Sequence, residues 1–401
     1  MAVEDGWNAE DALGRDLPEG PDGRLAWHIV FGVLRNRSKV DAALRPHLKQ
    51  PLAALDAPVR AVLRLGAFEK LFSRTPDHAV VQQAVEVAKR AGAKRASGLV
   101  NAVLRRVREP ESLSRPEQLD HPAWLVARWD ARYGPDATDT WCARNRTIPP
   151  VCLVARDAEA LARILEEREL SDAPQAELEG SVLPRTRLVP ASSDLPGVDE
   201  GTAWVQDPSS VQVADRFAGH LVRAGTVLDA CAAPGGKSAR LWSSGFPVTS
   251  TDLETRMLKL HANRERITSD APESPDWTVQ PFDWTAEEPA ALGEFDGVLV
   301  DAPCTGLGTL RRHPEIRWRR KPTDFAPAAA KQLEILRRAA MCVRAGGVLG
   351  YAVCSPAPEE GPEVFTKFLE EHPQFTQIDQ WASAPPTGDE DAHQLFVARR
   401  N

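Results

Sequence analysis

Apolar residues recur at intervals of three and four positions from Leu25 to about Val107, which is the spacing of one face of a helix. Prolines at positions 46, 51, 58 and 76 interrupt this pattern and divide it into roughly five to seven predicted helices. The stretch is therefore predicted to form a compact all-helical domain. The clearest repeats are Ala26, Ile29, Val30, Val33 and Leu34, then Val59, Val62, Leu63 and Leu65, then Leu99, Val100, Val103, Leu104 and Val107.

From Asp207 onward, short strand-like runs alternate with helical patterns, as in βαβ units. Such alternation predicts a mainly parallel sheet with helices on both faces. Most of the runs end in Asp or Cys, and ligands bind outside the carboxyl ends of parallel strands. One crevice is therefore expected to be lined by the residues at or near the strand ends, Asp229, Asp252, Asp283, Asp301 and Cys354. The predicted strands are TVLDA (226–230), PVTSTD (247–252), TVQPFD (278–283), GVLVDAP (297–303) and GVLGYAVC (347–354).

The chain is predicted to divide into four parts. Residues 1–20 form an acidic, disordered tail without hydrophobic periodicity. Residues 21–146 form the helical domain, and Pro149 and Pro150 mark a joint after it. Residues 147–205 form a small α/β module with several turns, and residues 206–401 form the α/β domain.

The charge distribution changes what the composition implies about partners. The formal net charge is −8, which alone argues weakly against nucleic acid. Residues 24–108, however, contain 17 Lys and Arg against 5 Asp and Glu. A basic face of this kind attracts phosphates, so the helical domain is predicted to bind nucleic acid.

No apolar stretch approaches the roughly 20 residues that span a bilayer, and the N-terminus has no apolar signal core. We therefore expect a cytoplasmic protein without membrane contact. The six cysteines form no CxxC pair and have no His-rich partner segment, so neither disulfides nor a metal site are expected.

The segment LDACAAPGGKSARL (228–241) reads as a strand, a glycine-rich turn and a helix. A phosphate-binding P-loop needs Gly at position 231, which is Cys here, and Pro234 stiffens the turn. Gly235 and Gly236 still let a ligand approach the backbone closely. Acids at successive strand ends can bind ribose hydroxyls and an adenine amino group, which suits S-adenosylmethionine. The expected cofactor-binding residues are Cys231, Ala232, Ala233, Pro234, Gly235, Gly236 and Lys237, together with Asp252, Asp283 and Asp301.

Two cysteines follow apolar runs, in VDAPCTGLG (300–308) and in YAVCSP (351–356). Either Cys304 or Cys354 could be a nucleophile, and either could be a small residue of the core. Spacing alone does not assign the roles.

Three long motifs, DACAAPGGKS, DAPCTGLGTLRRHPEIRWRR and YAVCSPAPEEG, resemble the signatures of the Sun/Fmu family of RNA (cytosine-5)-methyltransferases. The helical region resembles the NusB-like RNA-binding domain of the bacterial branch that methylates small-subunit ribosomal RNA, and NAVLRR (101–106) and HPAWLVARW (121–129) match that branch. The resemblance covers about residues 24–400. It implies an all-α NusB-like domain, the small α/β linker module and a Rossmann-like, S-adenosylmethionine-dependent methyltransferase domain.

The same resemblance implies the chemistry. Cys354 attacks carbon 6 of cytosine, which makes carbon 5 able to accept a methyl group, and Cys304 aids release of the product. Asp301 contacts the base and Lys237 helps to order the site. A transfer-RNA substrate and a non-catalytic RNA-binding assembly factor remain alternatives. The protein is expected to act as a monomer on ribosomal RNA.

Between the cysteines, residues 308–321 carry six basic residues and Trp318. This loop is expected to contact RNA phosphates and to stack a base, or, alternatively, to pair with nearby acids on the surface. The chain also departs from the family pattern, with Val353 where Thr is usual and Gly361 where Asn is usual.

Overall fold

The computed structural model describes residues 8–14, 17, 20–157, 159–162, 195, 197–271, 274–385 and 390–401. The chain forms two compact units, each with its own core. Unit 1 comprises residues 1–148 and 310–320, and unit 2 comprises residues 149–309 and 321–401. Part of the predicted linker module, residues 163–194, lies outside the described residues.

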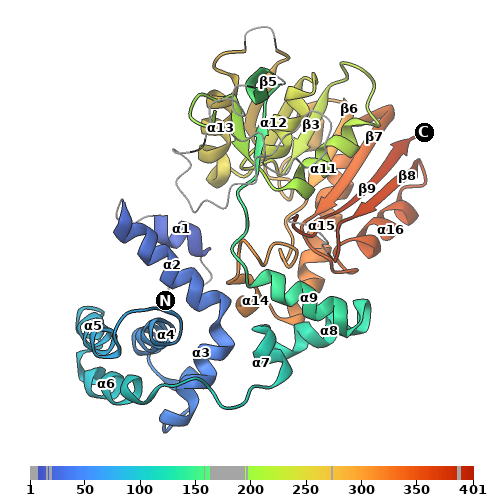
Figure 1. The fold of residues 1–401 in the computed structure, drawn as a ribbon. Coiled ribbons are helices and arrows are strands. Elements are labelled where there is room, and N and C mark those ends of the chain that lie inside the picture. Colours follow the sequence, from blue (N-terminus) through green and yellow to red (C-terminus); the bar gives the residue numbers. More distant parts are fainter. Residues whose placement is uncertain are drawn as a thin grey trace. The chain divides into compact units, whose positions relative to one another are not determined.

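Unit 1 is helical in its described part, as the periodicity predicts (Figure 1). Its main core is formed by helices α2 to α6 and consists of apolar residues that recur every three or four positions. Leu44, Leu63 and Leu104 in this core are fully buried. A proline is the first residue of α2 and α9 and the second of α4, where its missing N–H has no helical partner to lose. The helices are α1 (Ala9–Gly14), α2 (Pro21–Arg35), α3 (Arg37–Leu44), α4 (Ala57–Phe72), α5 (Asp77–Arg90), α6 (Ser97–Arg106), α7 (Arg115–Leu119), α8 (Ala123–Tyr133), α9 (Pro135–Asn145) and α14 (Ile316–Arg319).

The first of these helices corrects the predicted disorder of residues 1–20. Ala9 is fully buried in a small cluster with Phe31 and Leu34 of α2, and this packing stabilises α1. The sequence around α1 is too polar to reveal the helix by its pattern, because only a few of its residues face the cluster.

The basic loop was predicted to be part of the α/β domain, residues 206–401. Its residues 310–320 instead belong to unit 1. Arg317 is fully buried, and its guanidinium donates to the carbonyls of Asp120 (3.2 Å), Asn145 (2.8 Å) and Leu310 (3.0 Å). Trp318 donates its indole N–H to the carbonyl of Leu34 at 2.7 Å. These side chains hold the loop inside its unit, so the expected RNA contact is wrong for Arg317.

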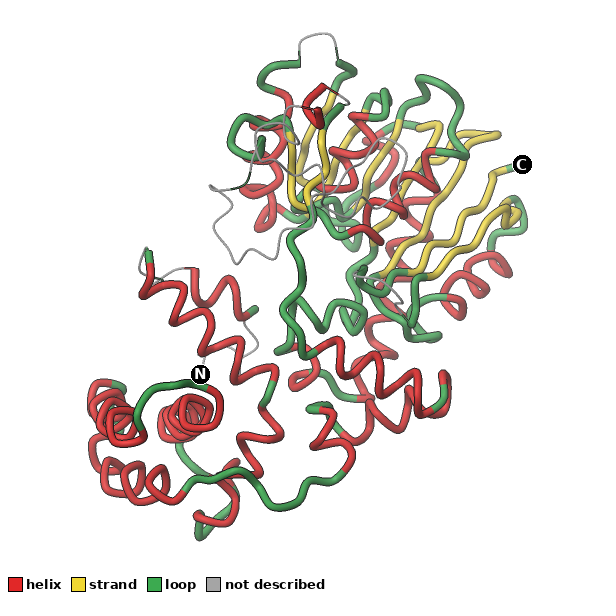
Figure 2. Tube along the Cα trace, in the orientation of Figure 1, coloured by secondary structure: helices red, strands yellow, loops and turns green. Residues whose placement is uncertain are grey.

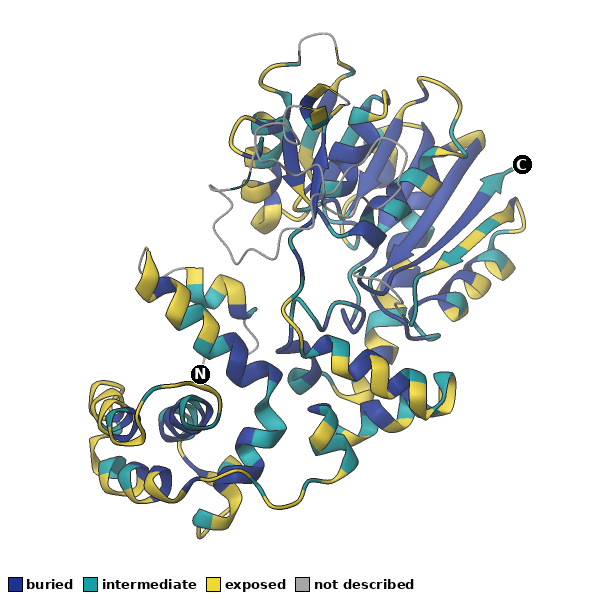
Figure 3. Cartoon of the chain, viewed as in Figure 1, coloured by how far each residue is buried: buried dark blue, intermediate teal, exposed yellow. Residues whose placement is uncertain are grey.

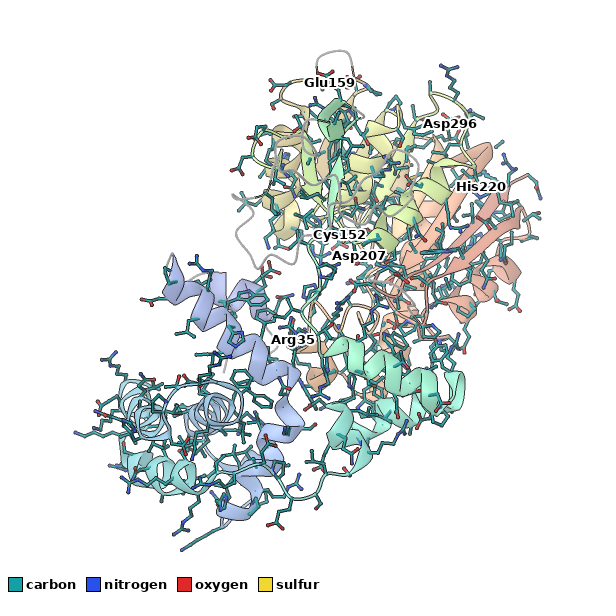
Figure 4. The ribbon with its side chains drawn as sticks, viewed as in Figure 1. Arg35, Cys152, Glu159, Asp207, His220 and Asp296 are labelled. Carbon is teal, nitrogen blue, oxygen red and sulfur yellow. The ribbon has the colours of Figure 1, made fainter. Side chains whose placement is uncertain are left out.

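A second contact of the same segment involves Arg35 at the end of α2, which Figure 4 labels. Its guanidinium donates to the carbonyl of Arg311 at 3.3 Å. Burial, followed by the charge of Arg311, lowers the pKa of Arg35 to about 10. The segment is therefore attached to unit 1 at both its beginning and its end.

Unit 2 contains a seven-stranded sheet in the order β5-β4-β3-β6-β7-β9-β8 (Figures 1 and 2). The first five strands in this order are parallel, and β9 pairs antiparallel with both neighbours. The main strands are β3 (Val227–Ala230), β4 (Val248–Asp252), β5 (Trp277–Pro281), β6 (Phe295–Asp301), β7 (Val343–Val353), β8 (Phe375–Ala382) and β9 (Gln394–Arg400). A separate antiparallel pair is formed by β1 (Leu153–Ala155) and β2 (Ala203–Val205).

Two cores cover the two faces of this sheet, because successive residues of a strand point to opposite faces. Leu299 faces one core, while its neighbours Val298 and Val300 face the other. The central strands are accordingly buried along most of their length (Figure 3). The covering helices of unit 2 are α11 (Pro208–Ala218), α12 (Gly236–Ser243), α13 (Met257–Thr268), α15 (Phe325–Ala340) and α16 (Pro362–Glu371). The predicted parallel, Rossmann-like arrangement is confirmed.

The beginning of α11 contacts the residue just before β9. Asp207, labelled in Figure 4, accepts from the N–H of Ser209 at 2.9 Å as the N-cap of the helix. The hydroxyl of Ser209 lies 2.7 Å from Nδ1 of His393, just before β9. Ser209 therefore links the first turn of α11 to the residue just before β9.

Candidate active site

The glycine-rich turn follows β3 and leads directly into α12. Gly235 has a φ of 106°, a left-handed conformation that favours glycine at this turn. Asp252, at the end of β4, accepts from the N–H of Ala233 at 2.9 Å through Oδ2 and from the N–H of Leu253 at 2.8 Å through Oδ1. A single carboxylate therefore fixes the turn to the neighbouring strand.

A cavity of about 230 Å³ opens at the carboxyl ends of the strands. It brings together three of the predicted cofactor-binding residues, Cys231, Asp252 and Asp283. Asp283 accepts from the N–H and the hydroxyl of Thr285 (2.9 and 2.6 Å), and these hydrogen bonds lower its pKa. The other lining residues are Leu253, Arg256, Phe282, Trp284, Thr285, Pro303, Lys331 and Ile335.

Sequence reasoning missed Arg256, Trp284 and Lys331 as lining residues of this cavity. Trp284 follows the predicted strand end at Asp283, so its position one residue further along was a usable signal. Lys331 lies in the middle of α15, and nothing in the local pattern of that helix distinguishes it.

Asp229 does not line the cavity, contrary to the prediction from strand ends. It is fully buried and accepts from the hydroxyl of Ser238 at 2.5 Å. Burial raises its pKa to about 7, although the hydrogen bond from Ser238 acts to lower the pKa. A chain of hydrogen bonds continues from Ser238 to Ser250 and to the indole N–H of Trp277. The side chain of Asp229 therefore lies in the interior of the domain, where it contacts α12.

The two cysteines meet beyond the ends of neighbouring strands. β6 and β7 are parallel, with Asp301 paired to Ala352, so the loops after them begin side by side. The sulfur atoms of Cys304 and Cys354 lie 3.2 Å apart, and both residues are partly accessible. Pro303, just before Cys304, also lines the cavity. The thiol pair therefore lies next to the candidate cofactor site.

Lys237 and Asp301 form an ion pair in this site, with 2.7 Å between Nζ and Oδ2. Lys237 is nearly buried in the first turn of α12. Burial lowers its pKa, but the charge of Asp301 and the hydrogen bond to it outweigh this, and the charge of Cys354 adds to them. The net shift is upward, so Lys237 is a cation.

The charged groups next to the two thiols are of opposite sign, Glu360 for Cys304 and Lys237 for Cys354. The hydrogen bond to Cys354 raises the pKa of Cys304 well above its ordinary value, and burial and the charges of Cys354 and Glu360 raise it further. Cys354 instead interacts with the cationic Lys237. A neighbouring cation favours a thiolate, whereas a neighbouring carboxylate favours a neutral thiol.

The other cysteines are free thiols in different surroundings. Cys142, Cys152 and Cys342 are buried, and burial raises the pKa of Cys142 to about 12 and of Cys342 to about 11. Burial also raises the pKa of Cys231, which lies in the glycine turn with a φ of 61°. None of these four forms a thiol pair within the described residues.

The glycine at position 361 has a structural reason in this chain. A Cβ at this position would lie 2.6 Å from the side-chain amide of Gln394. That amide donates to the carbonyls of Ser355 (2.6 Å) and Ala357 (3.4 Å), in the loop that follows Cys354. Gly361 therefore leaves room for a side chain from β9 to support the cysteine loop.

The described part of the chain contains neither a membrane-spanning helix nor a cluster of metal-binding side chains. None of its helices is both long and apolar enough to span a bilayer. No cluster of three or more His, Cys, Asp or Glu side chains among the described residues is arranged to hold a metal ion.

Residues 220–396 match the family described as 16S rRNA methyltransferase RsmB/F, and residues 3–109 match the NusB family. The probable ribosomal RNA small subunit methyltransferase B of Bacillus subtilis (strain 168) is 33% identical over 375 residues, covering 88% of this chain and 80% of that protein. The ribosomal RNA small subunit methyltransferase B of Xanthomonas campestris pv. campestris is 34% identical over 389 residues, covering 94% and 85%. The expected NusB-like domain is confirmed.

Two solved structures share the fold. PH0851 superposes with a TM-score of 0.81 at 22% identity, covering 97% of this chain and 93% of that one. NSun6 from Pyrococcus horikoshii, solved with SFG, gives a TM-score of 0.56 at 15% identity, covering 70% and 98%.

Proposed function

The chain belongs to the RsmB/F family of 16S rRNA methyltransferases, and from this we propose that it methylates carbon 5 of a cytosine in small-subunit ribosomal RNA. The observation that carries the proposal is the pair of sulfurs at 3.2 Å, beside the ion pair of Lys237 and Asp301. We expect the enzyme to act as a monomer in the cytoplasm, where a reducing environment keeps both thiols free.

Cys354 is the proposed nucleophile, as the family resemblance implies, and the cationic Lys237 lies within electrostatic reach of its sulfur. Its sulfur adds to carbon 6 of the cytosine, and the ring becomes an enamine that is nucleophilic at carbon 5. S-adenosylmethionine, when bound, supplies the methyl group as a sulfonium. A general base then takes the proton from carbon 5, and the electron pair of that C–H bond restores the double bond between carbons 5 and 6. The bond between carbon 6 and sulfur breaks at the same time, with its electron pair returning to Cys354.

Two further residues have proposed roles in this reaction, Asp301 after the addition step and Cys304 in release of the product. Cys304 aids release of the product, which its position beside the attacking sulfur supports. Asp301 contacts the base at its ring nitrogen, and its carboxylate stabilises that nitrogen in the protonated form after addition. Lys237 holds Asp301 through their ion pair and orders the site.

The cavity supports the proposed cofactor. Asp252 and Asp283 offer carboxylate oxygens for ribose hydroxyls and for an adenine amino group, and Phe282 and Trp284 offer apolar surface for the adenine ring. The glycine turn, residues 231–237, is proposed to contact the rest of the cofactor through its backbone.

The Asp252→Asn variant is expected to weaken S-adenosylmethionine binding by about 10- to 100-fold, because a charged acceptor is lost both to the turn and to the ribose. Isothermal titration calorimetry measures the dissociation constant. Asp270→Asn, at an exposed position of the same domain, is the control and should bind as the wild type does. A dissociation constant of Asp252→Asn within twofold of the wild type would remove Asp252 from the cofactor site.

The function itself is tested with the full-length protein, small-subunit ribosomal RNA and S-adenosylmethionine that carries a labelled methyl group. The RNA is digested to nucleosides and analysed by mass spectrometry, and the expected product is labelled 5-methylcytidine. Label in transfer RNA alone would assign the alternative substrate. Tight cofactor binding without label in any cellular RNA would identify a non-catalytic assembly factor.

A further inference from the structure

We propose that Glu360 is a positioning residue whose carboxylate joins the loops after β6 and β7 and so sets the distance between the two cysteine sulfurs. The proposal rests on the function above, because that function gives the sulfur spacing its importance. Glu360 lies in the loop before α16, six residues after Cys354, and sequence reasoning gave it no role.

The carboxylate of Glu360 is fully buried between the loops. Through Oε1 it accepts from the N–H of Thr305 at 2.7 Å, and through Oε2 it accepts from the hydroxyl of Thr305 at 2.5 Å. Through Oε2 it also accepts from the hydroxyl of Ser355 at 2.5 Å. Thr305 directly follows Cys304 and Ser355 directly follows Cys354, so one side chain holds the residue next to each sulfur.

Gln332 of α15 extends this arrangement to the other side of Cys304. Its Nε2 donates to Oε1 of Glu360 at 3.2 Å and to the carbonyl of Pro303 at 3.0 Å. The hydroxyl of Tyr351, on β7, donates to the backbone carbonyl of Glu360. Cys304 is therefore held at both neighbouring residues, and the backbone of Glu360 is held by the strand that leads to Cys354.

The identity of the residue matters because every group facing the carboxylate is a donor. Oε1 faces two N–H groups, and one of them belongs to the backbone and cannot turn away. Oε2 faces two hydroxyls, which can rotate to accept instead. A glutamine can therefore occupy the site with its carbonyl toward Thr305 N, but its bonds to the hydroxyls are weaker because the charge is lost.

Loss of that charge also acts on the thiols. The carboxylate of Glu360 contributes to the raised pKa of Cys304, after the hydrogen bond to Cys354, burial and the charge of Cys354. Glu360 therefore joins the two loops and also favours the neutral thiol at Cys304.

The experiment compares Glu360→Gln with Glu363→Gln, which changes an exposed carboxylate in the first turn of α16. The first readout is the affinity for phenylarsine oxide, which requires two neighbouring thiols, with Cys304→Ala as the background. The second is methyl transfer to small-subunit ribosomal RNA, with kcat and the cofactor dissociation constant measured separately. Glu360→Gln should bind the arsenical on the order of tenfold more weakly and lose about 10- to 100-fold in kcat, with unchanged cofactor affinity.

The readouts separate the possible failures. Wild-type values of both arsenical affinity and kcat in Glu360→Gln would overturn the proposal. If the wild type methylates no RNA but Glu360→Gln still loses arsenical affinity, the proposed function fails and the positioning of the thiols stands. If Glu360→Gln does not fold, Ser355→Ala decides, because it removes one hydrogen bond to the carboxylate and leaves the carboxylate itself in place. An affinity several-fold below wild type supports the proposal, and an unchanged affinity overturns it.

Discussion

Cys354→Ala is expected to lose at least about 10⁴-fold in methyl transfer, because no other group replaces a covalent nucleophile. It should also form no RNA–protein adduct. Cys304→Ala is expected to lose at least about 100-fold in turnover, yet to accumulate an adduct with RNA that survives denaturant. The difference follows from the proposed order of events, in which Cys354 makes the bond to carbon 6 and Cys304 acts only when that bond has to break.

Denaturing gel electrophoresis with labelled ribosomal RNA measures the adduct. Cys342→Ala is the control, since this buried thiol lies in the same domain and donates only to the carbonyl of Pro289 at 3.6 Å. It should methylate RNA and accumulate no adduct. An adduct in Cys354→Ala but not in Cys304→Ala would exchange the two roles, and an adduct in neither variant would contradict covalent catalysis.

Arg317→Ala is expected to destabilise unit 1 by about 3 kcal/mol, because it leaves buried carbonyls without a donor and opens a cavity. The guanidinium donates to Asp120 at the end of α7 and to Asn145 at the end of α9. The carbonyl ends of helices carry partial negative charge, so a cation is favourable there. Burial lowers the pKa of Arg317 only to about 9, and it therefore stays charged at neutral pH.

Hydrogen exchange of the amides in α7 and α9 tests this expectation locally, without requiring the two units to unfold together. Protection of these amides should fall in Arg317→Ala, by on the order of 100-fold for a 3 kcal/mol loss. Arg24→Ala, at an exposed position of α2, should leave protection unchanged within about threefold. Equal protection in both variants would show that Arg317 does not hold the segment.

Local patterns predicted the helical character of unit 1 and the strands β3 to β7, but not α1, β8 or β9. The three- and four-residue spacing around Leu63 and Leu104 predicted buried helix faces, and both side chains are fully buried. The predicted strand 247–252 ends at Asp252, as β4 does, whereas the predicted strand 297–303 runs two residues beyond the end of β6 at Asp301. Such predictions succeed because each depends on neighbouring residues and on a fixed repeat.

The site was predicted in part for the same reason. In a parallel sheet the carboxyl ends of strands share one edge, so Asp252 and Asp283 come to one cavity. The rule failed for Asp229, because Ser238 of α12 takes up its carboxylate inside the domain. A strand end indicates an edge of the sheet, but not which side of a turn a side chain occupies.

The basic loop shows a different limit. Its six cations have the composition of an RNA-binding surface, and charge counting cannot separate exposed from buried arginines. Arg317 is buried because carbonyls of residues 172 and 197 positions away converge on it. No pattern within the loop contains that information.

The sequence by itself determined the helical and parallel-sheet units and the two candidate thiols, since periodicity and motif residues are properties of short segments. Only the tertiary structure decided that the sulfurs of Cys304 and Cys354, 50 residues apart, lie at 3.2 Å, and that Glu360 joins their loops. The physical reason is that hydrogen bonds and burial depend on distances in space. Chain folding sets these distances between residues whose separation along the sequence is arbitrary.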